Sequence, residues 1–363
     1  MDFRDLSIFI RLPDIELYNR EGKGVLIDMT EKTFQQIPVA VLDLAPVNLG
    51  STATESFANS VELAQHVEKL GFNRYWLAEH HNMPGIGSSA TSVLIGHIAG
   101  KTNSIRVGSG GVMLPNHAPL VIAEQFGTLA SLYPDRIDLG LGRAPGSDQA
   151  TAYALRRTLH STGDEFPQQV MELENYFSDN PVGKVRAYPG TGMNIPLWLL
   201  GSSGFSAQLA AQKGLPFSFA SHFAPDYTMQ ALQLYHQNFK PSAALDSPYA
   251  MVGVSLIVAD TQERAEWLAT SSQQQMFSLM KGEPTTFQPP IDDLGSVWTP
   301  REIVMFRDKL KSESMIVGTP DLVREKLAAF ISKTRANEVI VNSPIFYQED
   351  RLHSWSLLAD MME

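Results

Sequence analysis

Residues 196–221 read PLWLLGSSGFSAQLAAQKGLPFSFAS, and this stretch contains the pattern that best indicates the fold. Two apolar runs, Pro196–Ser202 and Pro216–Ser221, flank a helical pattern around Gln208–Lys213. Short apolar runs that alternate with amphipathic helices are typical of a parallel sheet whose strands are joined by crossover helices. The stretch therefore predicts one strand–helix–strand unit of such a sheet.

The same alternation begins at Ile37 and continues along the chain, which gives eight strand-like runs in all. The other six are Pro38–Val47, Arg74–Glu79, Ile105–Leu114, Arg136–Gly142, Tyr249–Ala259 and Glu338–Ser343. Eight such units fit an α/β fold of the TIM (β/α)8 barrel type better than an open doubly wound sheet, which usually has fewer strands. We expect residues 37–363 to form this barrel domain.

Residues 1–36 do not follow the barrel pattern, and we expect them to be an N-terminal extension of uncertain role. Met29, followed by Thr-Glu-Lys-Thr and the first strand, resembles a natural start, so residues 1–28 are interpreted as an upstream extension. A short strand pair with a turn at Glu21–Gly24 is the alternative.

The connections between strands carry their own signals. Thr52 and Glu55 predict a capping box at the start of a helix over about Thr54–Leu70, and Pro119 predicts the first position of another helix. The connections from Pro145 to Ile195 and from about Ser271 to Thr319 are longer than barrel closure requires. We expect the second to be an irregular loop that covers the catalytic mouth, with Phe287 and Trp298 contributing a dry wall.

The composition excludes several classes of function. The 363 residues are 44% hydrophobic and 18% charged, and 39 acidic against 28 basic residues give a net charge of −11. An acidic chain repels nucleic acid and anionic membranes. The sequence contains no cysteine, so a redox function would need a bound cofactor. Without a membrane span or a signal-peptide pattern, the chain is interpreted as cytoplasmic.

The second strand run ends in Ala78-Glu79-His80-His81, which places imidazoles where catalytic groups of a barrel normally lie. His80 is the candidate general base. A structural histidine pair and a metal hydrolase are the alternatives. Adjacent histidines on a strand point in opposite directions, and only Asp43, Glu79 and His222 are available at other strand ends, so no metal site is predicted.

Glycines interrupt the third run, which reads VGSGGVMLP over 107–115. Glycine weakens a strand and often marks a place where a flat ligand lies against bare backbone. Gly110 and Gly111 are therefore candidates for contact with a flat cofactor ring, and a barrel corner that admits only glycine is the alternative.

Arg143 follows the fourth run, and serines follow the fifth. An arginine fork binds phosphate oxygens in pairs, and hydroxyl and N–H groups at a helix N-terminus also bind anions. These residues predict a shared phosphate site. A surface ion pair of Arg143 with Asp148, and a plain helix cap for the serine, are the alternatives.

The stretches 76–81, 108–115, 136–143 and 196–211 together resemble the luciferase-like monooxygenase family, at matching spacing, and the resemblance runs from about Pro38 to the C-terminus. It implies a TIM barrel that binds reduced FMN supplied by a separate flavin reductase. In that chemistry O2 forms a C4a-peroxyflavin, which oxidises a small organic substrate. The resemblance also implies a homodimer.

The same resemblance implies roles for individual residues. His80 matches the catalytic histidine beside the flavin, and Gly110-Gly111 matches a non-proline cis peptide that supports the flavin ring. Arg143, Ser203 and Ser206 match residues that hold the flavin phosphate. Ser202 stands where luciferase has an acidic residue in the flavin pocket, and the reactive cysteine of luciferase has no counterpart. A deazaflavin (F420)-dependent dehydrogenase and a non-catalytic flavin-binding protein are the alternative functions.

Overall fold

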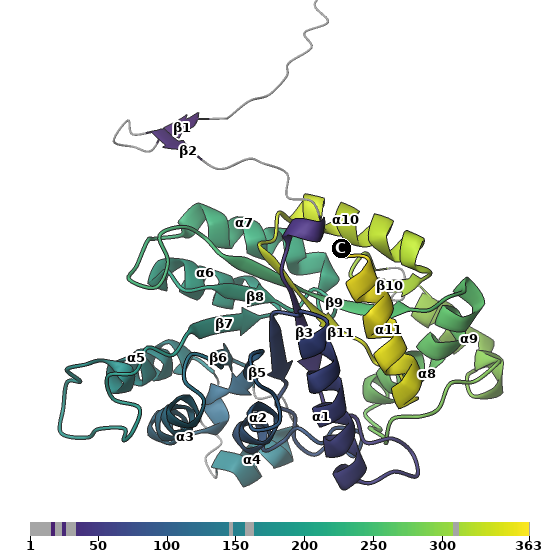
Figure 1. The fold of residues 1–363 in the computed structure, drawn as a ribbon, viewed down its shortest axis with the longest axis horizontal. Coiled ribbons are helices and arrows are strands. Elements are labelled where there is room, and N and C mark those ends of the chain that lie inside the picture. The colour runs from purple at the N-terminus through teal and green to yellow at the C-terminus, as the bar shows by residue number, and fades with distance from the viewer. Residues whose placement is uncertain are drawn as a thin grey trace, which may run out of the picture.

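In the computed structural model, eight parallel strands close into a barrel (Figure 1). The structure describes residues 16–18, 24–26, 34–144, 148–156, 163–307 and 312–362. The barrel strands are β3 (Val39–Asp43), β4 (Arg74–Leu77), β5 (Arg106–Met113), β6 (Ile137–Gly142), β7 (Leu197–Gly201), β8 (Phe217–Phe219), β9 (Ala250–Val258) and β11 (Glu338–Asn342). Each lies within one of the eight predicted runs, so the predicted fold class is confirmed.

Neighbouring strands follow chain order around the barrel, and β11 closes it by pairing with β3 on one side and β9 on the other. A further short strand, β10 (Met315–Gly318), pairs with the upper half of β9, where Met315 lies opposite Ser255. β8 pairs only with the lower part of β9 and ends at the pair Phe219–Val252. β10 therefore adds a parallel partner to β9 beyond the end of β8.

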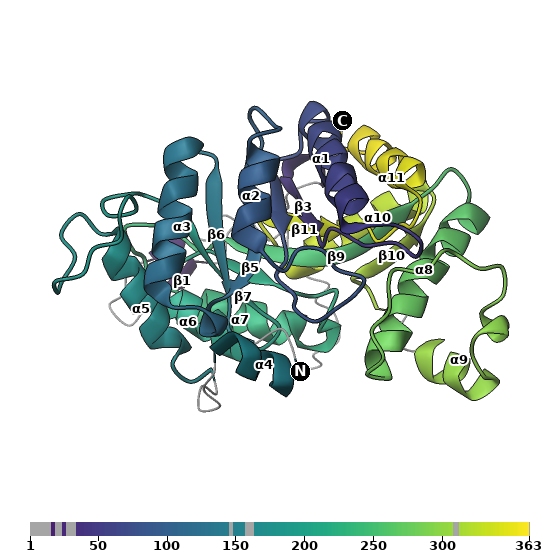
Figure 2. The ribbon, with the colours of Figure 1, turned by 90° about the horizontal axis from the view of Figure 1, so that it is seen from below.

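Helices surround the barrel (Figures 1 and 2). They are α1 (Ala53–Lys69), α2 (Thr91–Ala99), α3 (Pro119–Leu132), α4 (Gln149–Arg156), α5 (Phe166–Phe177), α6 (Gly204–Lys213), α7 (Thr228–Asn238), α8 (Gln262–Met280), α9 (Pro300–Arg307), α10 (Pro320–Thr334) and α11 (Gln348–Asp360). Single 3-10 turns lie at η1 (Phe34–Gln36), η2 (Leu114–Asn116), η3 (Pro225–Tyr227) and η4 (Leu294–Ser296).

Two of these helices begin as their sequence predicts. Thr52 and Glu55 form the reciprocal capping box of α1, and Pro119 occupies the first turn of α3. Among the described helices, none has the length and apolar character needed to cross a membrane.

Both faces of the barrel strands are buried. Their outer face packs against the helices in one large core that includes Tyr75, Phe126 and Phe217. The inner face fills the barrel with a second cluster, made of Ala40, Leu42, Trp76, Ala78, Trp198, Met251 and Ile340. Because side chains alternate between the faces of a strand, these positions identify which residues of each strand face the lumen.

The prediction of an irregular loop over 271–319 is wrong in part. α8 continues to Met280, and the remainder contains α9 and β10. Phe287 is buried and stacks on Phe346 with a centroid separation of 6.2 Å. Trp298 instead packs on Phe277 in a separate small core, so the two predicted wall residues lie in different clusters.

The long connection after Gly142 contains α4 and α5 in its described parts. In the extension, β1 (Glu16–Tyr18) and β2 (Gly24–Leu26) pair antiparallel, which is the strand pair considered as the alternative. Residues 21–23, where its turn was predicted, lie outside the described residues.

Candidate active site

The barrel is closed at its N-terminal end by a network of buried charges. Arg74 donates to Asp138 at 2.6 Å and to Glu338 at 2.8 Å, and Arg106 donates to Asp138 at 2.6 Å. Above this network, Trp76 and Trp198 meet edge to face with a centroid separation of 5.2 Å. Charges below and indoles above fill this part of the lumen, which leaves the C-terminal mouth as the candidate binding region.

His80 lies at this mouth, three residues after β4, and is half-buried. The backbone N–H of Ala78 still donates to Asp43, which extends the β4 ladder beyond the strand. Trp76 and Ala78 face the lumen, and continued alternation beyond the strand predicts the same side for His80. The position fits the predicted catalytic role, which stays a prediction.

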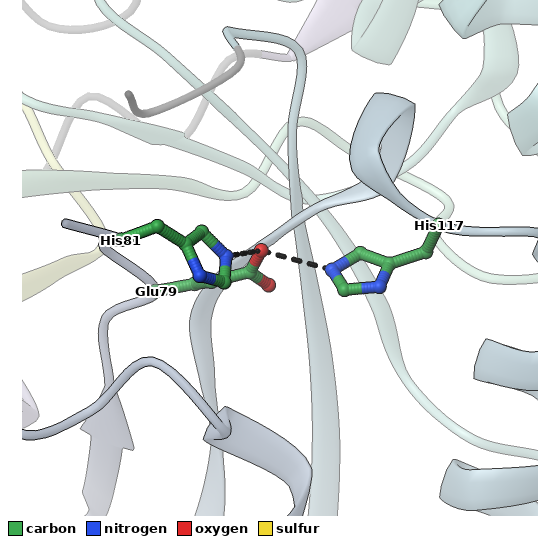
Figure 3. Close-up of side chains that lie close together, drawn as sticks. All are labelled: Glu79, His81 and His117. Atoms are coloured by element: carbon green, nitrogen blue, oxygen red, sulfur yellow. Dashed lines mark hydrogen bonds and ion pairs between the residues drawn. The ribbon is translucent and has the colours of Figure 1, made fainter. Parts of the chain in front are cut away.

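Glu79 leaves the same segment in the other direction and joins two histidines (Figure 3). Its Oε1 lies 2.8 Å from His81 Nε2 and 2.9 Å from His117 Nε2, and its Oε2 accepts from the backbone N–H of Met113 at 3.1 Å. Burial alone would raise the pKa of Glu79, but the contacts with His117, His81 and Met113 lower it below its ordinary value. Glu79 is therefore a buried carboxylate held in its ionised form.

The peptide bond between Gly110 and Gly111 is cis, as the resemblance implies. The barrel itself leaves little room for side chains here. A Cβ on Gly110 would lie 2.7 Å from Leu42 Cδ1, and one on Gly111 would lie 2.7 Å from the carbonyl oxygen of Gly140. Packing therefore supports the alternative that only glycine fits, and the predicted contact of these glycines with a cofactor stays a prediction.

The predicted phosphate residues come together between β6 and α6. The guanidinium of Arg143 lies over the ring of Phe205, 4.2 Å from its centroid, and Phe205 belongs to the first turn of α6. Ser203 is the N-cap residue of α6, yet its side chain makes no capping hydrogen bond. Ser206 is buried beside Gly201. A cation and an uncapped helix N-terminus thus share one corner of the mouth.

The two alternatives for these residues receive no support from the described contacts. Asp148 bonds to Asn82 at 3.0 Å and to the Thr151 hydroxyl at 2.7 Å, and no bond of Asp148 to Arg143 occurs among the described residues. Ser202, also predicted to bind the cofactor, is half-buried at the end of β7.

The candidate metal-ligand set of Asp43, Glu79 and His222 does not assemble. Asp43 is fully buried and accepts from Ser60 at 2.6 Å and from Arg351 at 2.7 Å. These partners belong to α1 and α11, so Asp43 faces the helices and not the mouth.

His222 instead belongs to the mouth as a separate group that the sequence did not single out for catalysis. Its backbone N–H donates to Gly253, and a Cβ on Gly253 would lie 2.3 Å from its Nδ1. Gly253 lies two residues after the lumen-facing Met251, so the imidazole folds across the inner face of β9. Burial lowers the pKa of His222 to about 4, which keeps the ring neutral. Only the glycine at 253, 31 positions away, signals this contact.

Comparison with known proteins finds relatives that match most of the chain. The family model described as luciferase-like monooxygenase matches residues 37–337. The uncharacterized protein YvbT of Bacillus subtilis is 56% identical over 325 residues, which cover 89% of this chain and 96% of that protein. A luciferase-like monooxygenase of Escherichia coli is 54% identical over 336 residues, which cover 92% of this chain and 99% of that protein.

A solved structure is similar over the same extent. The crystal structure of apo-MsnO8 superposes with a TM-score of 0.80 at 33% identity and covers 90% of this chain and 98% of its own. The match of the family model extends over most of the barrel, from before β3 to just before β11. This chain therefore belongs to the luciferase-like monooxygenase family.

Proposed function

We propose that the protein is a monooxygenase that uses reduced FMN and O2 to oxidise a small organic substrate. Its family is one of oxygenases, and the flavin is the finer part of the proposal. The observation that carries the proposal is the corner formed by Arg143 and the N-terminus of α6, because it offers positive charge and free donors to a phosphate.

The residues present fit the phosphate end of FMN. The first N–H groups of a helix have no partner within the helix, and the Ser203 side chain does not cap α6. Arg143 is half-buried, so its charge is less screened than that of a surface arginine. Phe205 holds the guanidinium plane by a cation–π contact, which limits its motion.

The rest of the mouth fits a flat ring. The glycines at 110 and 142 present backbone where side chains would otherwise project into the lumen. Trp76 and Trp198 exclude water from below, and a dry site strengthens polar interactions with a bound group. The bound flavin would supply the reaction with O2, and His80 would hold or move a proton at an imidazole nitrogen.

F420 is the second candidate cofactor. Two proteins that share the fold were solved with different cofactors: the oxygenating constituent of 3,6-diketocamphane monooxygenase with FMN, at 17% identity, and a secondary alcohol dehydrogenase with an F420–acetone adduct, at 15% identity. F420 carries a polyanionic tail, which would need several basic residues at the mouth. The net charge of −11 favours FMN.

The partners of this reaction are part of the same proposal. Reduced FMN would come from a separate flavin reductase, and the active form would be a homodimer. A protein of Bacillus subtilis named N-acetyl-S-alkylcysteine monooxygenase is 30% identical over 334 residues, so thioethers are the first substrates to screen.

Binding of FMN and riboflavin, in oxidised and reduced form, tests the phosphate site. We expect the wild type to prefer FMN, and Arg143→Met to lose about 10- to 100-fold in FMN affinity while riboflavin affinity changes little, because hydrogen bonds to charged groups contribute about 1.5–3 kcal/mol. Arg186→Met is the control, because Arg186 lies in the irregular segment after α5 and bonds to the carbonyl of Gly183. Equal affinity of the wild type for FMN and riboflavin would contradict the proposal.

A further inference from the structure

Glu79, His81 and His117 form a cluster that the proposed reaction does not use. Glu79 and His81 come from the segment after β4, and His117 follows η2, which continues β5. Figure 3 shows the two imidazoles approaching the carboxylate from different sides. One oxygen, Oε1, meets both Nε2 atoms, so the three potential donor atoms converge on one point.

We propose that these three side chains form a binding site for a divalent transition cation of the Zn2+ class. Each residue offers one ligand atom, and the three atoms lie within 4.8 Å of one another. Two imidazole nitrogens and one carboxylate oxygen are a ligand set typical of Zn2+, whereas Mg2+ and Ca2+ prefer oxygen ligands only.

The geometry requires a small adjustment. Tetrahedral bonds of about 2.0–2.1 Å separate ligand atoms by roughly 3.3 Å. The observed separations from Oε1 are 2.8 and 2.9 Å, which are hydrogen bonds. The cation would bind the Nε2 lone pairs of neutral imidazoles that carry their proton on Nδ1, and each oxygen–nitrogen pair would open by about half an ångström.

The surroundings favour a cation. Glu79 is 2% exposed, and its ion-pair partners within the described residues are only these two histidines, so no permanently charged lysine or arginine balances it there. A dication would supply that balance. The bond from Met113 N–H to Oε2 orients the carboxylate and leaves Oε1 to bind the cation. Polar groups around metal ligands commonly have this role.

The two histidines of the cluster keep part of their surface exposed to solvent. The side chains of His81 and His117 are 14% and 27% exposed, and a fourth coordination position would be open to solvent or substrate atoms. His80 lies between two of the proposed ligands, so a bound cation would fix the backbone on both sides of it. The site does not depend on flavin binding.

Zn2+ and Co2+ titrations of the untagged, metal-stripped, flavin-free protein test the site. We expect one equivalent of Zn2+ by calorimetry and one equivalent of Co2+ with the visible spectrum of a tetrahedral site. Glu79→Gln, His81→Ala and His117→Ala should each weaken Zn2+ binding by at least 10- to 100-fold, because outer partners of ligands alone contribute that much.

His353→Ala is the matched control, since His353 is an exposed histidine that contacts Asp260 at 2.9 Å, and it should bind Zn2+ as the wild type does. Circular dichroism identifies variants that remain folded, and three separate substitutions keep the test available if one unfolds. No saturable binding below about 1 mM would overturn the proposal. Unchanged binding in the folded Glu79, His81 and His117 variants would also overturn it. FMN binding by the same preparations is scored separately, so the proposed function can fail while the cation site stands, and the reverse.

Discussion

His80 is the residue on which the proposed chemistry depends. It follows β4 on the side of the lumen-facing Ala78, where a cofactor in the mouth would lie. We predict that His80→Ala lowers the rate of substrate oxidation by about 10²- to 10⁴-fold with FMN affinity nearly unchanged, because a general base contributes that much. Steady-state rates and FMN titration of the same sample measure both quantities. His353→Ala is the control, and a wild-type rate in His80→Ala would exclude the role.

The free energy of unfolding should depend on pH through His222. Its pKa is lowered from 6.5 to about 4 in the folded protein because burial disfavours the charged ring. Between these values the unfolded chain binds more protons, so this group's contribution is fully present above pH 6.5 and is lost as the pH falls toward 4. Because His222 keeps part of its surface exposed, solvent screens the effect, and the expected loss is on the order of 1–2 kcal/mol.

Urea unfolding of wild type and His222→Asn at several pH values measures this contribution. The variant should show a flatter decline of unfolding free energy between pH 6.5 and 4. Parallel curves for the two proteins would show that His222 is not responsible.

The sequence predicts single residues of the site better than the contacts between them. The place of His80 at the end of a strand follows from strand order, and so does the corner shared by Arg143 and Ser203. The contact of Glu79 with His117 spans 38 positions and depends on how η2 turns after β5, so no local pattern indicates it. The contact of the His222 ring with Gly253 is likewise not indicated by any local sequence pattern.

At the scale of elements, the segment around Phe287 is fixed to the loop after β3. Phe287 N–H donates to Val47 at 2.9 Å, and Leu49 N–H donates to Phe287 at 2.8 Å. The buried Phe287 ring holds these bonds in place. We predict that Phe287→Ala makes the amides of Leu49 and Phe287 exchange faster with deuterium, while amides of β5 are unchanged, because the loss of packing acts on local opening.

Hydrogen exchange monitored by mass spectrometry checks this expectation. Val297→Ala serves as the control because Val297 is 50% exposed. If exchange of the two amides is the same in Phe287→Ala as in the wild type, the side chain does not anchor the segment.

The elements between Ser271 and Thr319 also show where sequence patterns fail. The glycines and prolines at 282–300 are breaking signals, and they indicate a loop correctly over part of the span. β10 is only four residues long and contains a glycine, so its pattern is too short to distinguish a strand from a loop. Its strand conformation comes from pairing with β9, a tertiary contact.

For the whole molecule, Asp43 and Arg351 join the first barrel strand to the last helix. Arg351 is 4% exposed and donates to the fully buried Asp43 at 2.7 Å. We predict that Arg351→Met lowers the free energy of unfolding by about 3–5 kcal/mol, because it leaves a buried carboxylate without its cation. Urea unfolding at pH 7 measures the loss. Arg264→Met, which breaks an exposed pair with Asp350, should cost less than about 1 kcal/mol.

The stabilisation by the Asp43–Arg351 pair should be lost at low pH. Burial alone would raise the pKa of Asp43, but Arg351 and hydrogen bonds from Ser60 and Tyr75 lower it below its ordinary value. The stabilisation is therefore present above the unfolded pKa and is lost as the pH falls through the folded one. The difference between wild type and Arg351→Met should shrink below about pH 4. A difference that stays constant down to the acid transition would exclude the ion pair as its cause.

In the proposed reaction, the protein inserts oxygen from O2 into a substrate with electrons from reduced FMN. The most direct measurement supplies reduced FMN from a flavin reductase under 18O2, with thioethers such as N-acetyl-S-alkylcysteines as the first substrates, and analyses the products by mass spectrometry. We expect one 18O atom in each product molecule and no product under argon. Substrate oxidation that continues under argon, or a product whose oxygen comes from water, would contradict it and favour a dehydrogenase.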